Sequence, residues 1–109
     1  MSDSIKVTVG SGNVFADLGL PDAEERLLKA NIVAELRRLV RRRNLTQVKA
    51  AKRIGISQPD LSRLFRGDFD AYSAGRLMKM LTLFEQDIEI VMRAHRTPGQ
   101  PGSITFKEA

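Results

Sequence analysis

Polar side chains recur on one side of a short stretch of the chain, GISQPDLSRLFRG at residues 55–67. If the stretch is helical, the outward positions are Gln58, Pro59, Ser62, Arg63 and Arg66. The inner face then carries Ile56, Leu61 and Leu64. Amide, hydroxyl and guanidinium groups are those that hydrogen-bond base edges and phosphates in the DNA major groove. The pattern predicts a short helix that faces duplex DNA.

Two helices joined by a tight turn must position these side chains. Thr46 is a plausible cap for a first helix over residues 47–54, with Val48, Ala51 and Ile54 turned inward, and Gly55 ends it. Ser57 caps a second helix over 58–66, with Pro59 in its first turn and Asp60 able to complete a capping box. A small residue, Ala51, is expected where the two helix axes approach, as in a helix-turn-helix.

The stretch TQVKAAKRIGISQPDLSRLFRG, residues 46–67, resembles the helix-turn-helix proteins of the phage-repressor and Cro (XRE) type. With SGNVFADLGLPDAEERLLKA before it and LTLFEQDIEIVMR after it, the resemblance extends over residues 11–93 to HigA-like antitoxins, which pair with RelE/HigB-type ribonuclease toxins. It implies a mainly α fold: a repressor-like domain of four to five helices with a C-terminal β-strand.

The resemblance also implies roles for single residues. Gln47 would touch a phosphate and brace Gln58, while Gln58 and Arg63 would read base edges. Many relatives carry a polar side chain where this chain has Pro59, so that contact is expected to be apolar, for example to a thymine methyl group. The predicted DNA-binding residues are Thr46, Gln47, Gln58, Pro59, Ser62, Arg63, Arg66 and Arg43. The alternative explanation is that Ala51, Gly55 and Leu61 occur at these positions only because an apolar helical bundle with a glycine turn requires them for packing.

Charge is segregated along the 109 residues. Residues 29–66 carry eleven Lys and Arg against two acids, a net charge of +9, whereas the remainder carries −4. A local positive field of this kind is typical of a nucleic-acid surface, although a solvated helix face is the alternative. The arginines at 37–38 and 41–43 are either phosphate contacts or a solvated helix end. Some of them are expected to be only solvated, and Arg42 and Arg43 are favoured as the phosphate contacts.

The rest of the chain frames this unit. Pro21 and Asp22 precede an apolar stripe of spacing three and four, which predicts a helix over 23–43 with Asp22 as its cap. Ser73 caps a further helix over 74–84, and the alternation of Ile88, Ile90 and Met92 predicts a strand over 87–93. The expected domains are an N-terminal arm at 1–20, a helix-turn-helix domain at 21–86, a dimerisation strand at 87–96, and a linker and tail at 97–109. Residues 5–9 and 103–107 can form short strands.

Nothing in the sequence predicts catalysis, a metal or a cofactor. There is no cysteine, and His95 is the only histidine. The pair Gly10 and Gly12 is not followed by the Gly-Lys-Ser/Thr of a phosphate loop. The carboxylates of residues 68–89 read as ordinary surface acids. No signal peptide or membrane span is predicted, so we expect a cytoplasmic protein that is not an enzyme.

Three functions remain open at this stage. The first is a DNA-binding repressor that forms a homodimer on operator DNA and also neutralises a RelE/HigB-like toxin. The second is a stand-alone regulator of phage or host type without a toxin. The third is a protein-binding adaptor that has lost DNA affinity, against which the retention of Gln47, Gln58 and Arg63 argues.

Overall fold

The computed structural model describes residues 18–19 and 22–108 of the chain. Four helices follow one another in this part: α2 (Ala23–Arg42), α3 (Gln47–Ile54), α4 (Gln58–Phe65) and α5 (Ala74–Thr82). The predicted helices agree with these bounds to within two residues. The predicted arm at 1–20, including the strand-like residues 5–9, lies almost entirely outside the described residues.

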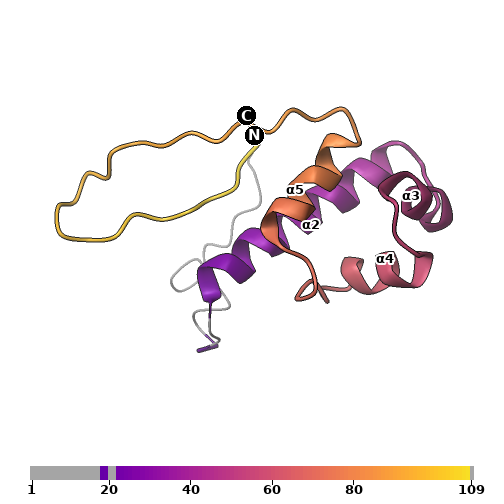
Figure 1. Cartoon of the computed structure of the whole chain (residues 1–109), viewed down its shortest axis with the longest axis horizontal. Helices are drawn as coiled ribbons and strands as arrows, with labels where there is room; N and C mark the ends of the chain where they lie inside the picture. The colour runs from indigo at the N-terminus through magenta and orange to yellow at the C-terminus, as the bar shows by residue number, and fades with distance from the viewer. Residues whose placement is uncertain (1–17, 20–21, 109) are drawn as a thin grey trace.

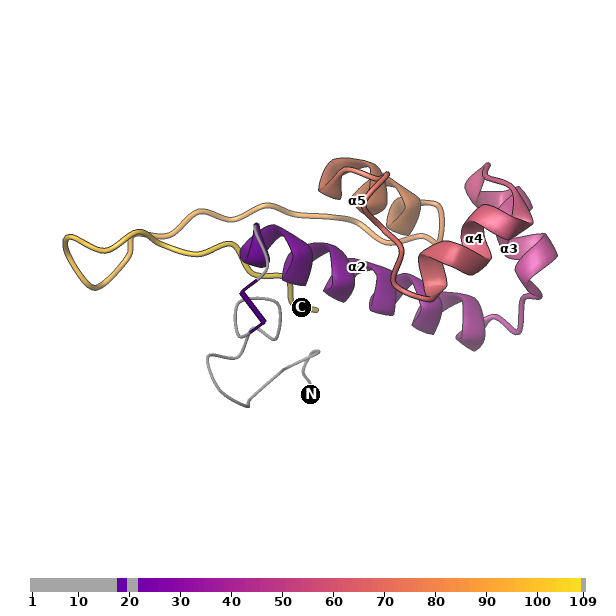
Figure 2. The same cartoon turned by 90° about the horizontal axis from the view of Figure 1, so that it is seen from below.

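The long helix α2 is the scaffold on which the other helices pack. Its residues Ile32, Leu36, Leu39 and Val40 are spaced by three or four positions and are buried, as the apolar stripe predicts. Helix α5 lies along α2, while α3 and α4 lie together at the C-terminal end of α2 (Figure 1; Figure 2). The core is therefore a layer between α2 and α5 that continues beneath α4.

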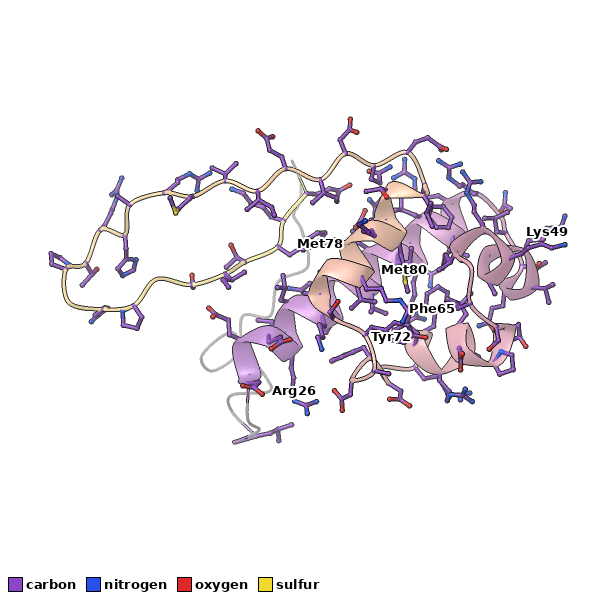
Figure 3. All side chains as sticks on the ribbon, in the orientation of Figure 1. Arg26, Lys49, Phe65, Tyr72, Met78 and Met80 are labelled. Carbon is purple, nitrogen blue, oxygen red and sulfur yellow. The ribbon has the colours of Figure 1, made fainter. Side chains whose placement is uncertain are left out.

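Large side chains from α2, α4 and α5, together with Phe84 after α5, fill this core. The most completely buried are Ile32, Leu36, Leu61, Leu64, Leu77, Leu81 and Phe84. Phe65 and Tyr72, from the end of α4 and the loop before α5, lie between these elements (Figure 3). No buried side-chain nitrogen or oxygen of the described residues lacks a hydrogen-bond partner, so this packing leaves α4 on a well-supported base.

Two details of the predicted helices are wrong. Asp22 occupies the N-cap position of α2 but has left-handed backbone angles, φ 53° and ψ 42°, and its side chain accepts no capping hydrogen bond. Val48 was predicted to face inward, yet it is 65% exposed, and Ala50 is buried in its place beside Ala51. Ala51 is buried and Ile54 is partly buried against the core, as predicted, so only Val48 was placed on the wrong face of this eight-residue helix.

The predicted C-terminal strands are absent from the described residues. Residues 87–96 and 103–107 are not assigned to any strand, and the segment after α5 instead runs out from the body and returns (Figure 1). The only backbone hydrogen bond recorded within 86–108 is the turn contact from Gln100 N to Thr97 O, at 3.4 Å. A strand needs a ladder partner, and alternation in the sequence does not supply one.

The returning tail touches the helical domain at three points. The backbone N–H of Ile104 donates to Glu24 Oε2 at 2.9 Å, Phe106 packs against the hydrophobic core, and Arg38 Nη2 pairs with Glu108 Oε2 at 2.6 Å. Between these contacts and the end of α5, the side chains of Ile90, Val91 and Met92 are exposed. The segment thus presents apolar groups that the described chain does not cover.

Candidate nucleic-acid interface

The turn between α3 and α4 is fixed by backbone and cap hydrogen bonds. Thr46 Oγ1 accepts the N–H of Lys49 at 3.2 Å, and Ser57 Oγ accepts the N–H of Asp60 at 3.1 Å. Gly55 ends α3 in the left-handed region, φ 92° and ψ 26°, and its N–H donates to Ala51 O at 2.7 Å. Glycine adopts this conformation without the steric cost that a Cβ atom imposes. The sequence-predicted caps and turn are therefore confirmed.

Burial divides α4 into an inner and an outer face. Leu61 and Leu64 have no exposed surface, and the small residues Ala50 and Ala51 of α3 are also buried. Side chains of this size let the two short helices meet closely. Helix α4 is too short to be stable alone, so packing of its inner face keeps it folded and leaves its outer face exposed to solvent.

The predicted reading residues gather on this outer face. Gln58, Pro59, Arg63 and Arg66 are exposed and Ser62 is half-buried, while Thr46 and Gln47 are exposed at the start of α3. Gln58 Nε2 donates to Gln47 Oε1 at 2.8 Å, which is the bracing contact that the resemblance implied. The structure thus brings together residues from two helices eleven positions apart.

Arginines on α4 also have neighbours on their own helix. Arg63 Nη2 hydrogen-bonds Asp60 Oδ1, three residues earlier, and the two side chains are 52% and 45% exposed. Arg66 Nη1 lies 3.4 Å from Ser62 Oγ. Asp60 therefore pairs with Arg63, and the reciprocal half of the predicted capping box is not among the recorded hydrogen bonds.

Arg43 lies apart from this group in its contacts. Its guanidinium pairs with Glu85 and donates to Phe84 O at 3.1 Å, at the C-terminal end of α5. Arg53 of α3 joins it there, with Nη2 at 2.9 Å from Glu85 Oε2 and Nε at 2.9 Å from Leu83 O. A DNA phosphate would have to compete with Glu85 for Arg43, so its predicted phosphate contact stays a prediction.

The same arginines sit on an aromatic ring. The guanidinium carbons of Arg43 and Arg53 lie 5.7 Å and 5.0 Å from the centroid of Phe84, within the range of cation–π attraction. The hydrogen bond from Arg43, followed by the charges of both arginines, lowers the pKa of the Glu85 carboxyl below its ordinary value. We call Arg43, Arg53, Phe84 and Glu85 the α5 clasp; it ties the ends of α2, α3 and α5 together.

Sequence reasoning missed two exposed residues of α3. Val48 and Lys49 both face solvent beside Gln47, and Lys49 projects away from the body of the molecule (Figure 3). The alanine pair at 50–51 was the signal for the correct helix phase, because two small residues in succession indicate the side of closest helix approach. An apolar and a cationic group therefore belong to the surface beside the turn.

The described residues contain no group of three or more His, Asp or Glu side chains placed to hold a metal ion. None of their helices has the length and apolar character needed to cross a bilayer. A shallow, open groove lies between α2 and the end of α4, lined by Ala30, Val33, Ala34, Arg37, Phe65, Arg66, Gly67 and Phe69. The outer face of α3 and α4 is thus the chemically distinctive surface of the described chain.

Two short helices with a glycine turn, one buried on its inner face and polar on its outer face, define a helix-turn-helix domain. A family model described as a helix-turn-helix domain matches residues 14–93. A solved structure described as an XRE-family transcriptional regulator is 37% identical, with a TM-score of 0.73, and the match covers 79% of this chain and 97% of that one. No curated protein matches the sequence. The chain belongs to the XRE family of helix-turn-helix proteins.

Proposed function

We propose that this protein is a sequence-specific transcriptional repressor that binds operator DNA through the outer face of α4. The observation that carries the proposal is the Gln47–Gln58 hydrogen bond of 2.8 Å, which joins the first residues of α3 and α4 on one exposed surface. A held glutamine has less rotational freedom to lose on binding, and its amide can pair with the N6 and N7 atoms of adenine. The proposal involves no catalytic step and no cofactor, and it places the protein in the cytoplasm with the chromosome.

The field around α4 supports the same function. The segment 29–66 has a net charge of +9, and Lys49, Arg63 and Arg66 are exposed within it. Phosphate contacts from such groups give affinity and make it salt-dependent, while base contacts give specificity. Thr46, Gln47 and Arg43 are assigned to phosphate or positioning roles, and Gln58, Pro59, Ser62, Arg63 and Arg66 to the groove.

Replacement of Arg63 by alanine tests the reading surface. Selection from random duplexes with the wild-type protein first defines the operator. We then expect Arg63→Ala to lose about 1–3 kcal/mol of binding free energy, through lost discrimination at one base pair. Arg96→Ala, which removes an equal charge from the exposed C-terminal segment, is the control. If both variants lowered affinity equally for every sequence, Arg63 would not be a reading residue.

The repressor is proposed to act as a homodimer, because one helix of eight residues reads too few base pairs to find a single genomic site. Residues 87–93 suit an antiparallel pair about a two-fold axis at Ile90. That register sets Ile88 opposite Met92 of the second copy and Asp87 opposite Arg93, which are an apolar and an oppositely charged pair, while Glu89 lies opposite Val91. The ladder absent from one chain would then form between two.

A proline in this segment tests the pairing. Ile90→Pro removes a ladder donor and should give monomers with weak operator binding, whereas Thr97→Pro, outside the paired residues, should not. Sedimentation and a DNA mobility shift measure the two properties. A dimeric Ile90→Pro protein with normal operator affinity would contradict the interface.

We further propose that the protein is the antitoxin of a RelE/HigB-like toxin. The support is the exposed apolar side chains of Ile90, Val91 and Met92, which a toxin can cover, together with the resemblance of residues 11–93 to HigA-like proteins. A stand-alone regulator is the alternative and accounts equally well for the fold. Co-expression with the product of the adjacent gene decides: a small basic protein that co-purifies and is inhibited supports the antitoxin, and its absence supports the stand-alone regulator.

A further inference from the structure

A carboxylate lies on the surface that the proposed function turns toward DNA. Asp60 is in the first turn of α4, two residues after Gln58 and three before Arg63, and its side chain is 45% exposed. A negative charge so close to phosphates opposes binding to every DNA sequence. Its position therefore calls for an explanation other than affinity.

The place of Asp60 is fixed by the cap of α4. Its backbone N–H donates to Ser57 Oγ at 3.1 Å, and its Oδ1 atom accepts Arg63 Nη2. Residues three apart on a helix are neighbours on its surface, so this ion pair holds the guanidinium along the outer face. The pair thus connects a cap residue to one of the two predicted base readers.

Helix stability explains the pair only in part. An acid in the first turn interacts favourably with the helix dipole, and an exposed ion pair contributes little to stability. An acid at residue 60 would interact favourably with the helix dipole even without an arginine at 63, so the dipole does not explain the ion pair. Gln58, the other reader, is also held by a neighbouring side chain, Gln47. Both predicted base readers are therefore oriented before any DNA is present.

We propose that Asp60 is a positioning residue that orients Arg63 for one base pair and discourages its use as a general phosphate contact. An arginine held at one nitrogen keeps its remaining N–H groups for guanine O6 and N7, the acceptors of a bidentate contact. On non-operator DNA, the same hold keeps the guanidinium from turning to a phosphate. Asp60 thereby lowers binding to the wrong sequences more than binding to the operator. The inference rests on the proposed DNA-binding function.

Asp60→Asn tests this role, with Asp68→Asn as the control for charge. Asp68 is exposed in the loop after α4; its backbone N–H donates to Arg63 O at 3.1 Å, a contact that Asp68→Asn keeps, and its carboxylate has no ion pair with a reader among the described residues. We expect Asp60→Asn to bind random duplex DNA more tightly, with a salt slope steeper by about one unit as Arg63 gains a phosphate. The ratio of operator to random binding should fall about tenfold. Asp68→Asn should change the ratio less than twofold, and urea melts of both variants establish that they are folded.

A double-mutant cycle separates positioning from direct readout. In an Arg63→Ala background, Asp60→Asn should leave the operator ratio unchanged, because there is no guanidinium left to orient. If the ratio fell equally in both backgrounds, Asp60 would itself contact a base, and the inference would be overturned. It would also be overturned if Asp60→Asn matched Asp68→Asn. Failure of the wild-type protein to select any operator would instead refute the proposed function.

Discussion

Gly55 and Gly75 predict opposite responses to one substitution, glycine to alanine. Gly55 has φ 92°, and a Cβ atom built on it meets nothing within 4 Å. Gly75 lies in α5 with ordinary helical angles, and its Cβ would lie 4.0 Å from Ser73 Oγ, an ordinary contact. No clash contributes at either site, so backbone conformation alone sets the sign of the change in stability.

The magnitudes follow from two terms. A non-glycine residue in the left-handed region costs about 1–2 kcal/mol. Removing a glycine stiffens the unfolded chain and returns about 0.4–1 kcal/mol. We therefore expect Gly55→Ala to lower the free energy of unfolding by about 1 kcal/mol. Gly75→Ala should raise it by about 0.5–1 kcal/mol, because only the favourable term and helix propensity act there.

Urea unfolding at one fixed protein concentration measures both variants, since a dimer's stability depends on concentration. Gly55→Asn, which tolerates left-handed angles, should lie between wild type and Gly55→Ala. A Gly55→Ala protein as stable as wild type would show that the turn relaxes away from its left-handed conformation. A destabilised Gly75→Ala protein would show that space, not backbone angle, decides at these sites.

Three further outcomes are expected. Glu85→Gln should destabilise the protein at pH 7, and its difference in unfolding free energy from wild type should vanish in acid. The pKa of the Glu85 carboxyl is lowered in the folded protein, so its stabilising effect exists above the ordinary value of 4.5 and is lost as the pH falls through the folded-state pKa. Urea melts at a series of pH values measure this. Phe84→Ala should lose about 3–5 kcal/mol by calorimetry, because Phe84 is fully buried; a loss below that of Gly55→Ala would contradict its place in the core. Gln47→Ala should weaken operator binding about 2- to 13-fold in mobility shifts, with random DNA less affected, because Gln58 loses its hydrogen-bond partner. A uniform loss would make Gln47 a phosphate contact only.

Local signals predicted most of the helical domain. Capping residues such as Thr46, Ser57 and Ser73 act through hydrogen bonds to backbone groups three positions away, so the sequence alone locates the helix starts. The apolar stripe of α2 is long enough to define its buried face. In the short helix α3, Ala51 and Ile54 were correctly predicted to face inward, but Val48 was not, because two turns contain too few apolar residues to fix the edges of the buried face.

Non-local features were not predictable in this way. The α5 clasp joins Arg43 and Arg53 to Glu85, more than thirty residues away, and no spacing rule signals such a contact. Likewise, alternation in residues 87–93 indicates that a strand can form but not whether a partner is within reach. The Gln47–Gln58 contact was expected only through family resemblance, since spacing alone does not choose it over other pairs.

The α5 clasp has a consequence for the proposed dimer on operator DNA. The exposed C-terminal segment leaves the helical domain at Glu85, whose backbone is left-handed at φ 57° and whose carboxylate pairs with Arg43, directly after α2, and with Arg53 of α3. The direction in which the segment leaves the domain is therefore coupled to the position of α3, the helix beside the reading surface. In a two-fold assembly joined through that segment, a small rotation at this joint would swing the two α4 helices through a wide arc. The conformation at Glu85 would then set which spacing of operator half-sites the two α4 helices can reach, although Glu85 is far along the chain from any side chain that reads a base.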